Sequence, residues 1–179
     1  MFNFILKCLW FFAPAGLANM FAFLSKYIRI LKVPIDFGKS FRGKRIFGDN
    51  KTWRGAFFGI LVGFLVFLLQ KYLYQFNFFH KLSLFDYPKM SWLFGLLLSS
   101  GAIIGDLIKS FFKRRVNIAP GQSWIPFDQI DYTITATALG LFIFFPGWSI
   151  AAGVVVIGFL LHILFNLASY ILKMKRSKL

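Results

Sequence analysis

The sequence is poor in acidic residues and almost free of cysteine. It contains six aspartates and no glutamate, against 21 lysines and arginines, for a formal net charge of +15. The single cysteine, Cys8, excludes an internal disulfide and a cysteine cluster for a metal. A basic excess is typical of chains that bind nucleic acid, anionic lipid head groups or phosphorylated substrates. In a chain that is 58% hydrophobic, lipid and phosphorylated substrates are favoured and nucleic acid is not.

Apolar residues are far more common than a soluble domain requires. Soluble domains are about 45–50% apolar, whereas this chain is 58% hydrophobic and has 26 phenylalanines among 179 residues. A soluble domain of this size could not bury so much apolar surface. The composition therefore predicts an integral membrane protein.

Five segments are candidates for transmembrane helices, which need about 20 mostly apolar residues. Their approximate bounds are residues 4–25, 55–74, 91–112, 132–145 and 148–172. The fourth is short and could extend backward into the preceding loop. The first could instead be a cleaved signal peptide, since Lys7 precedes an apolar run, but a single basic residue leads it. We expect an all-α polytopic membrane protein with about five transmembrane helices, forming one catalytic domain over residues 1–179.

Basic residues predict the orientation of these helices. They gather in two loops, at about residues 26–54 and 113–131, and in the tail at Lys173, Lys175, Arg176 and Lys178. Cytoplasmic loops of membrane proteins carry the excess of lysine and arginine. We therefore expect both loops and the C-terminus in the cytoplasm and, with five spans, the N-terminus outside. The expected location is the plasma membrane, with the active-site loops cytoplasmic.

Five of the six aspartates lie in or beside the two basic loops, so they are the candidate functional residues. Asp106 lies near the inner end of the third apolar segment, where an unpaired carboxylate is costly and is a functional candidate by default. Helical spacing places Ser110 and Lys113 on the same face as Asp106. A salt bridge from Asp106 to Lys109 or Lys113 is the structural alternative.

Asp128 and Asp131 are three residues apart at the start of the fourth segment, so on a helix their carboxylates share a face. Two close carboxylates repel and raise each other's pKa, and a divalent cation removes that repulsion. Hard oxygen ligands favour Mg²⁺, with Mn²⁺ as the alternative metal. Capping of the helix N-terminus by acidic residues is the structural alternative.

The first loop contains the run Gly48-Asp49-Asn50-Lys51-Thr52. Lys51 and Thr52 resemble the end of a phosphate-binding loop, but the Gly-x4-Gly-Lys-Ser/Thr spacing is absent. A glycine-rich turn at a helix start can still hold a phosphate through its backbone N–H groups. The alternative is a basic anchor for lipid head groups. Carboxylates for a metal and basic groups for phosphates together point to phosphoryl or nucleotidyl transfer.

Five stretches, in chain order, resemble the archaeal CDP-archaeol synthase family, a branch related to phosphatidate cytidylyltransferases. They are residues 14–19, 34–38, 48–55, 105–115 and 128–131. The broader cytidylyltransferase signature carries a His-Gly-Gly element before the aspartate pair, whereas this chain has Gln122-Ser123-Trp124-Ile125-Pro126. This departure favours the archaeal branch.

The resemblance implies transfer of CMP from CTP to 2,3-bis-O-(geranylgeranyl)glycerol 1-phosphate, with release of pyrophosphate and use of Mg²⁺. It implies that Asp106, Asp128 and Asp131 bind the metal or the metal-bound triphosphate, and that Lys113 joins them in catalysis. The residues expected to contact substrate are Asn19, Asp36, Asp49, Lys51, Thr52, Ser110, Arg114 and Arg115.

Three other functions fit parts of the pattern. A phosphatidate cytidylyltransferase would act on an ester lipid, and a lipid kinase of the polyprenol or dolichol type would use similar metal and phosphate groups. A non-enzymatic lipid-binding or transport protein would need no paired carboxylates.

Overall fold

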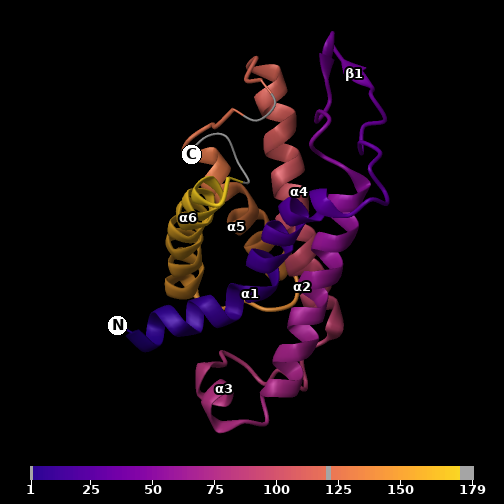
Figure 1. Ribbon diagram of the computed structural model, residues 1–179. Coiled ribbons are helices and arrows are strands. Elements are labelled where there is room, and N and C mark those ends of the chain that lie inside the picture. The colour runs from indigo at the N-terminus through magenta and orange to yellow at the C-terminus, as the bar shows by residue number, and fades with distance from the viewer. Residues whose placement is uncertain (1, 120–121, 174–179) are drawn as a thin grey trace.

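In the part of the chain that the structure describes, the regular secondary structure is helical apart from one small hairpin and an isolated bridge between Pro34 and Thr52. The computed structural model describes residues 2–119 and 122–173, so the tail residues Lys175, Arg176 and Lys178 lie outside the described residues. The helices are α1 (Phe2–Leu24), α2 (Trp53–Leu73), α3 (Asn77–Leu82), α4 (Trp92–Arg115), α5 (Phe127–Gly140) and α6 (Trp148–Ile171), with a 3-10 turn, η1 (Ser25–Tyr27), after α1. Strands β1 (Ser40–Phe41) and β2 (Lys44–Arg45) pair antiparallel. Figure 1 shows this hairpin at one end of the molecule and α3 at the other.

Four helices in the described part of the chain are long and apolar enough to cross a membrane: α1 with its following turn, α2, α4 and α6. The expected all-α membrane fold is therefore confirmed. Helix α5 has 14 residues, begins at Phe127 within the expected loop and ends at Gly140, so it falls short of the length that a span needs. The count of five spans is not confirmed, and the orientation that rests on it stays a prediction.

Close packing of α1, α2 and α4 forms the centre of the bundle. A Cβ atom on Gly63 of α2 would lie 2.5 Å from the carbonyl oxygen of Pro14 in α1, so a glycine is needed for this approach. Aromatic side chains fill the space beside it, with Phe67 and Phe94 in edge-on contact. The buried core comprises Cys8, Phe11, Phe12, Ala15, Ala18, Phe67, Tyr87, Phe94, Leu98, Ala102, Tyr132, Ala136 and Val154.

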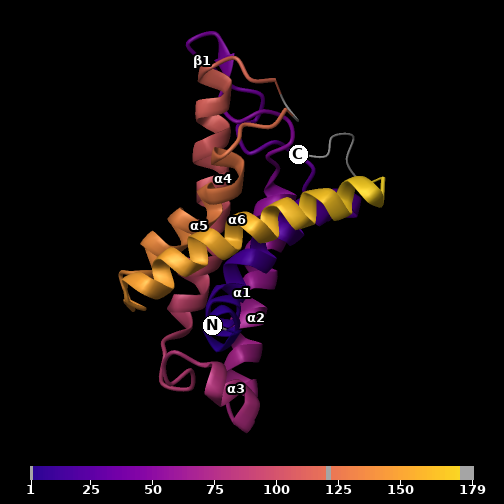
Figure 2. The same cartoon turned by 90° about the vertical axis from the view of Figure 1, so that its left-hand side faces the viewer.

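The outer faces of α2 and α6 carry exposed apolar side chains, among them Phe57, Leu65, Leu160 and Leu164. In water such surfaces would be unfavourable, whereas in a bilayer they meet hydrocarbon. Figure 2 shows α6 lying across one face of the bundle. The exposed faces agree with a protein that is surrounded by lipid.

Arg115, the last residue of α4, fastens the hairpin to that helix. Its guanidinium donates hydrogen bonds to the carbonyl oxygens of Phe41 (2.6 Å), Lys44 (3.1 Å) and Arg45 (2.5 Å). It also lies 4.6 Å from the centre of the Phe111 ring. Lys44 Nζ donates in return to the carbonyl oxygen of Arg115 at 2.8 Å. The loop between α1 and α2 is thereby held beside the C-terminal end of α4.

Candidate active site

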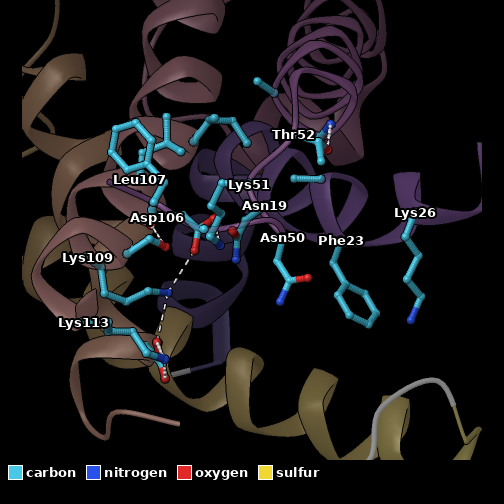
Figure 3. A pocket seen from close by; sticks show the side chains of 18 of the residues that line it. Asn19, Phe23, Lys26, Asn50, Lys51, Thr52, Asp106, Leu107, Lys109 and Lys113 are labelled. Atoms are coloured by element: carbon cyan, nitrogen blue, oxygen red, sulfur yellow. Dashed lines mark hydrogen bonds and ion pairs between the residues drawn. The ribbon is translucent and has the colours of Figure 1, made fainter. Parts of the chain in front are cut away.

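A cavity of about 750 Å³ lies where the loop between α1 and α2 meets α4. Asn19 and Phe23 of α1, the run 47–52 with the start of α2, the C-terminal half of α4, Asp128 of α5, and His162 and Asn166 of α6 line it. Pockets for small molecules usually measure about 300–1,000 Å³, so this cavity has the size of a ligand site. Figure 3 shows Lys51, Asp106, Lys109 and Lys113 together on one side of it.

Three aspartates meet at the ammonium group of Lys109. Its Nζ atom lies 2.9 Å from Asp106 Oδ1, 3.0 Å from Asp128 Oδ1 and 3.0 Å from Asp131 Oδ2. The side chain of Lys109 is 11% exposed and that of Asp131 is 9% exposed. Charges so far removed from water are costly unless they are paired. Lys109 therefore compensates the charge of three carboxylates at once.

Two further lysines complete this cluster. Lys51 donates to Asp106 Oδ2. Lys113 Nζ lies 3.1 and 3.0 Å from the two carboxylate oxygens of Asp128 and also donates to the carbonyl oxygen of Gln122. Three lysines thus face three aspartates, and their formal charges balance. We call Lys51, Asp106, Lys109, Lys113, Asp128 and Asp131 the charged cluster.

Close approach of α4 and α5 assembles the charged cluster. On α4, Asp106, Lys109 and Lys113 share one face, because residues three and four apart are neighbours on a helix. A Cβ atom on Gly105 would lie 2.5 Å from the carbonyl oxygen of Asp131, so only a glycine lets α5 lie so near. Asp128 and Asp131 are thereby brought within ion-pair distance of Lys109.

Asp36 fixes the shape of the loop rather than lining the cavity. Its fully buried carboxylate accepts hydrogen bonds from Arg45 Nη2 (2.8 Å) and from the backbone N–H groups of Gly38 (3.1 Å), Phe47 (3.0 Å) and Gly48 (3.0 Å). Burial by itself raises the pKa of Asp36, but the Arg45 guanidinium and these N–H donors outweigh it and hold the pKa well below its usual range. Arg45 also lies 2.7 Å from Asp49 Oδ1.

The loop delivers its next residues to the cavity mouth through short backbone pairing. Ile35 N donates to the carbonyl oxygen of Lys51 at 2.8 Å, and Trp53 N donates to that of Val33 at 3.0 Å. Thr52 then caps α2, since its Oγ1 accepts a hydrogen bond from Gly55 N at 3.2 Å. This path directs Lys51 toward Asp106 and leaves the N-terminal end of α2 at the cavity.

The structure separates the predicted site residues into two groups. Those that line the cavity are Asn19, Asp49, Lys51, Thr52, Asp106, Ser110, Lys113, Arg114 and Asp128. Asp36 and Arg115 do not, because their polar atoms bind the loop and the hairpin. Asp131 lies on the far side of Lys109, against a second, apolar groove. The hydroxyl of Ser110 donates to the carbonyl oxygen of Asp106 at 2.7 Å.

Lys109 was not among the predicted site residues. The available signal was its position three residues after Asp106, which indicated a salt bridge as the structural alternative. The structure has that bridge, and it adds Asp128 and Asp131 as further partners. These two contacts depend on how α5 packs, which spacing along α4 does not reveal.

The oxygen atoms of the charged cluster suit a divalent cation. In residues 2–119 and 122–173, no three acidic, histidine or cysteine side chains stand around an open point as a ready metal site; the three carboxylates converge on Lys109 instead. In the same residues Asp131 Oδ2 is buried and accepts no hydrogen bond, although Lys109 Nζ is 3.0 Å away. Carboxylate oxygens are the ligands that hard cations prefer. The donor set fits such an ion, and the three aspartates as its ligands stay a prediction.

A multi-pass helical membrane protein with lysines and aspartates buried beside a polar cavity has the features of an intramembrane enzyme. The chain belongs to the CDP-archaeol synthase family, whose model matches residues 1–178. Members of this family are cytidylyltransferases, and such enzymes generally use a divalent metal. The chain is therefore a nucleotidyltransferase.

Individual relatives cover nearly the whole chain. It is 39% identical over 178 residues to the CDP-archaeol synthase of Pyrococcus furiosus, with 96% of each chain covered. It is 35% identical over 175 residues to that of Methanocaldococcus jannaschii, with 97% of each covered. The solved structure of an intramembrane enzyme for archaeal membrane lipids biosynthesis shares the fold, with a TM-score of 0.67 and 24% identity over 86% of this chain and 91% of that chain.

Proposed function

We propose that this chain forms CDP-archaeol by transferring CMP from CTP to 2,3-bis-O-(geranylgeranyl)glycerol 1-phosphate. An oxygen of the lipid phosphate attacks the α-phosphorus of CTP, and a new bond forms between them. The bond from the α-phosphorus to the oxygen that bridges to the β-phosphate breaks, and pyrophosphate leaves. The observation that carries the proposal is the charged cluster at the wall of a cavity of nucleotide size, in a chain of this family.

Positive charge for the phosphates comes from the lysines of the charged cluster. Lys51 and Lys113 each hold a carboxylate at the cavity wall, and both line the cavity. When a triphosphate enters, their ammonium groups turn from the carboxylates to the phosphate oxygens. Such groups stabilise the negative charge that develops on the leaving pyrophosphate. Arg114, also in the lining, adds a further donor.

The exchange would release Asp106 from Lys51 and Asp128 from Lys113, so that oxygen atoms of these carboxylates could bind Mg²⁺. We assign Asp106, Asp128 and Asp131 as the residues that hold it, since their oxygen atoms already converge within 3.0 Å of Lys109 Nζ. Bound there, Mg²⁺ supplies charge neutralisation for the triphosphate. Lys109 keeps the three carboxylates facing one another before the nucleotide arrives.

The remaining nucleotide contacts come from the start of α2 and from α1. Thr52 caps α2, whose first turn lines the cavity together with Asp49 and Asn50. The N–H groups of this turn already donate to Val33, Leu31 and Thr52, so α2 offers a phosphate the positive end of its dipole rather than a free donor. Asn19 of α1 offers an amide that both donates and accepts hydrogen bonds, which suits the cytosine or ribose. Asp36 acts indirectly, by fixing the turn at Gly48.

The location of the nucleotide substrate indicates on which side of the membrane the active site lies. CTP is a cytoplasmic metabolite, and the loops that border the cavity carry most of the basic residues. We therefore assign the hairpin end of the molecule in Figure 1 to the cytoplasmic face of the plasma membrane.

Product analysis tests this function. Purified protein in detergent is given labelled CTP, Mg²⁺ and a panel of lipid phosphates with ether-linked isoprenoid or ester-linked acyl chains, together with the corresponding lipid alcohols. We expect pyrophosphate release and a lipid product that has gained CMP, with the ether lipid preferred. Preference for the ester lipid would assign a phosphatidate cytidylyltransferase. A product that is an alcohol plus one phosphate would assign a lipid kinase, and no product with any member of the panel would refute enzyme activity of this type.

A further inference from the structure

Helix α1 has a proline in its interior. Pro14 has no backbone N–H, so the carbonyl oxygen of Trp10, four residues earlier, loses its helical hydrogen bond. Proline kinks a helix at such a position, and Figure 1 shows that the two halves of α1 run in different directions. Inside a membrane no water reaches the freed carbonyl group, so another part of the protein must supply its donor.

The donor comes from α2. Gln70 donates a hydrogen bond from its side-chain Nε2 to the carbonyl oxygen of Trp10. Gln70 is 1% exposed, and its Oε1 atom is buried with no hydrogen-bond partner in the described part of the chain. A buried amide oxygen without a partner is unfavourable. Packing alone therefore does not account for a glutamine at this position, whereas the hydrogen bond to Trp10 does.

One buried face of α2 follows the carbonyl groups of α1 turn by turn. An added Cβ atom would lie 3.3, 2.8 and 2.5 Å from an α1 carbonyl oxygen in three successive contacts, which are those of Gly55 with Ala22, Gly59 with Ala18 and Gly63 with Pro14. Gln70 continues this series on the other side of the bend, at Trp10. The three glycines therefore hold α1 from Pro14 onward, and Gln70 holds the half that precedes it.

We propose that Gln70 is a positioning residue for the nucleotide: by fixing the bend of α1 it places Asn19 and Phe23 at the polar cavity. Both residues line that cavity, and each directly follows a residue that packs on a glycine of α2. Gln70 is not among the described residues that line the cavity, and it lies about 22 Å along α2 from Gly55. It therefore acts only through α1. This inference rests on the proposed use of CTP.

Kinetics of a double variant test the assignment. Gln70→Met keeps the length of the side chain and removes the donor. We expect the KM for CTP to rise about two- to tenfold, the range that one lost hydrogen bond at Asn19 predicts, while the KM for the lipid phosphate stays unchanged. In Pro14→Ala the backbone N–H of residue 14 becomes the donor to Trp10, so adding Gln70→Met to Pro14→Ala should change the KM for CTP no further. Gln75→Met, at an exposed position just after α2, is the matched control.

A wild-type KM for CTP in Gln70→Met would overturn the proposal. So would an equal rise in the KM for CTP when Gln70→Met is added to Pro14→Ala, or an equal rise in Gln75→Met. A rise of both KM values by the same factor would indicate a general structural defect and would overturn it as well. If Gln70→Met does not fold, Pro14→Ala should restore folding, and an equally unfolded double variant would refute the role of the hydrogen bond to Trp10.

Spin labels on α1 supply a readout that needs no turnover. In a Cys8→Ala background, labels attached through Ile5→Cys and Phe21→Cys report the bend from exposed positions on the two halves of α1, which would be about 24 Å apart along a straight helix. We expect a narrow distance distribution with Gln70 and a broader one in Gln70→Met, but no such broadening in the Pro14→Ala background. An unchanged distribution in Gln70→Met, in protein that releases pyrophosphate, would refute the positioning role alone. A broadened distribution, in a chain whose wild type releases no pyrophosphate, would refute the proposed reaction alone.

Discussion

Replacement of Lys109 by methionine removes the positive charge that three aspartates share, of which Asp128 is buried and Asp106 and Asp131 are partly buried. Methionine keeps the length of the aliphatic stem, so the change isolates the ammonium group. In Lys109→Met, Asp106 retains Lys51 and Asp128 retains Lys113. Asp131 loses the cation that lies 3.0 Å from its Oδ2. The variant therefore leaves one buried carboxylate uncompensated.

The size of the effect follows from this burial. Because Lys109 is 11% exposed and Asp131 is 9% exposed, water screens their interaction little. Breaking a buried ion pair by removing one partner costs about 3–5 kcal/mol. For a chain of this length that loss corresponds to a fall in melting temperature of roughly 6–20 °C. Removal of the stranded charge in Lys109→Met/Asp131→Asn should recover part of it, with an interaction energy of about 0.5–3 kcal/mol.

Thermal unfolding in detergent, followed by intrinsic fluorescence, measures both quantities. Lys81→Met is the matched control, since Lys81 is exposed on α3 and surface substitutions usually change stability by less than about 0.5 kcal/mol. For a chain of this length, a loss of 1 kcal/mol lowers the melting temperature by roughly 2 °C or more. A melting temperature of Lys109→Met within about 2 °C of that of Lys81→Met would therefore refute the reasoning. The reasoning would also be refuted if the stability losses of Lys109→Met and Asp131→Asn simply added up in the double variant.

Three further predictions concern the loop, the helix cap and the metal. Folding lowers the pKa of Asp36, so its ionised carboxylate stabilises the loop fully at pH values above its unfolded-state pKa of about 4. This stabilisation is lost as the pH falls below that value toward the lower folded-state pKa. Asp36→Asn should therefore lower the melting temperature at neutral pH but match the wild type in strong acid, and equal deficits at both would contradict this. Thr52→Ala should cost about 1 kcal/mol of stability through loss of the α2 cap and raise the KM for CTP, whereas Thr52→Ser should keep both near wild type. Chelation with EDTA should stop pyrophosphate release and added Mg²⁺ should restore it; full turnover in EDTA would contradict metal use.

The long helices were readable from the sequence because each carries an uninterrupted apolar run. The fourth expected segment, residues 132–145, was short and could extend backward into the loop, and α5 does so: it begins at Phe127, where Asp128 N donates to the carbonyl oxygen of Trp124, and it ends at Gly140, before the apolar run does. The hairpin, by contrast, was missed. Its turn uses Arg42 and Gly43, both at positive φ, and this pair gives a weaker turn signal than Asn-Gly or Asp-Gly.

In the site, the sequence indicated the aspartates because a carboxylate in an apolar segment is rare. The role of Lys109 was hidden, since it depends on α5 lying against Gly105. Asp36 and Arg115 were expected at the substrate because they stand at positions that match the resembled family. In the structure Asp36 accepts hydrogen bonds from backbone N–H groups of the loop, and Arg115 donates to carbonyl oxygens of the hairpin; these tertiary contacts could not be predicted from the sequence, and a substrate role for either residue stays a prediction.

Pyrophosphate release by aspartate variants tests the central claim most directly. Asp106→Asn, Asp128→Asn and Asp131→Asn each remove one carboxylate of the charged cluster, and Asp86→Asn, in the loop before α4 where Asp86 pairs with Lys89, is the control. We predict a loss of about 100-fold or more in kcat for the three cluster variants, in protein that still unfolds cooperatively, and wild-type turnover for Asp86→Asn. Wild-type turnover in folded Asp128→Asn and Asp131→Asn would contradict the account.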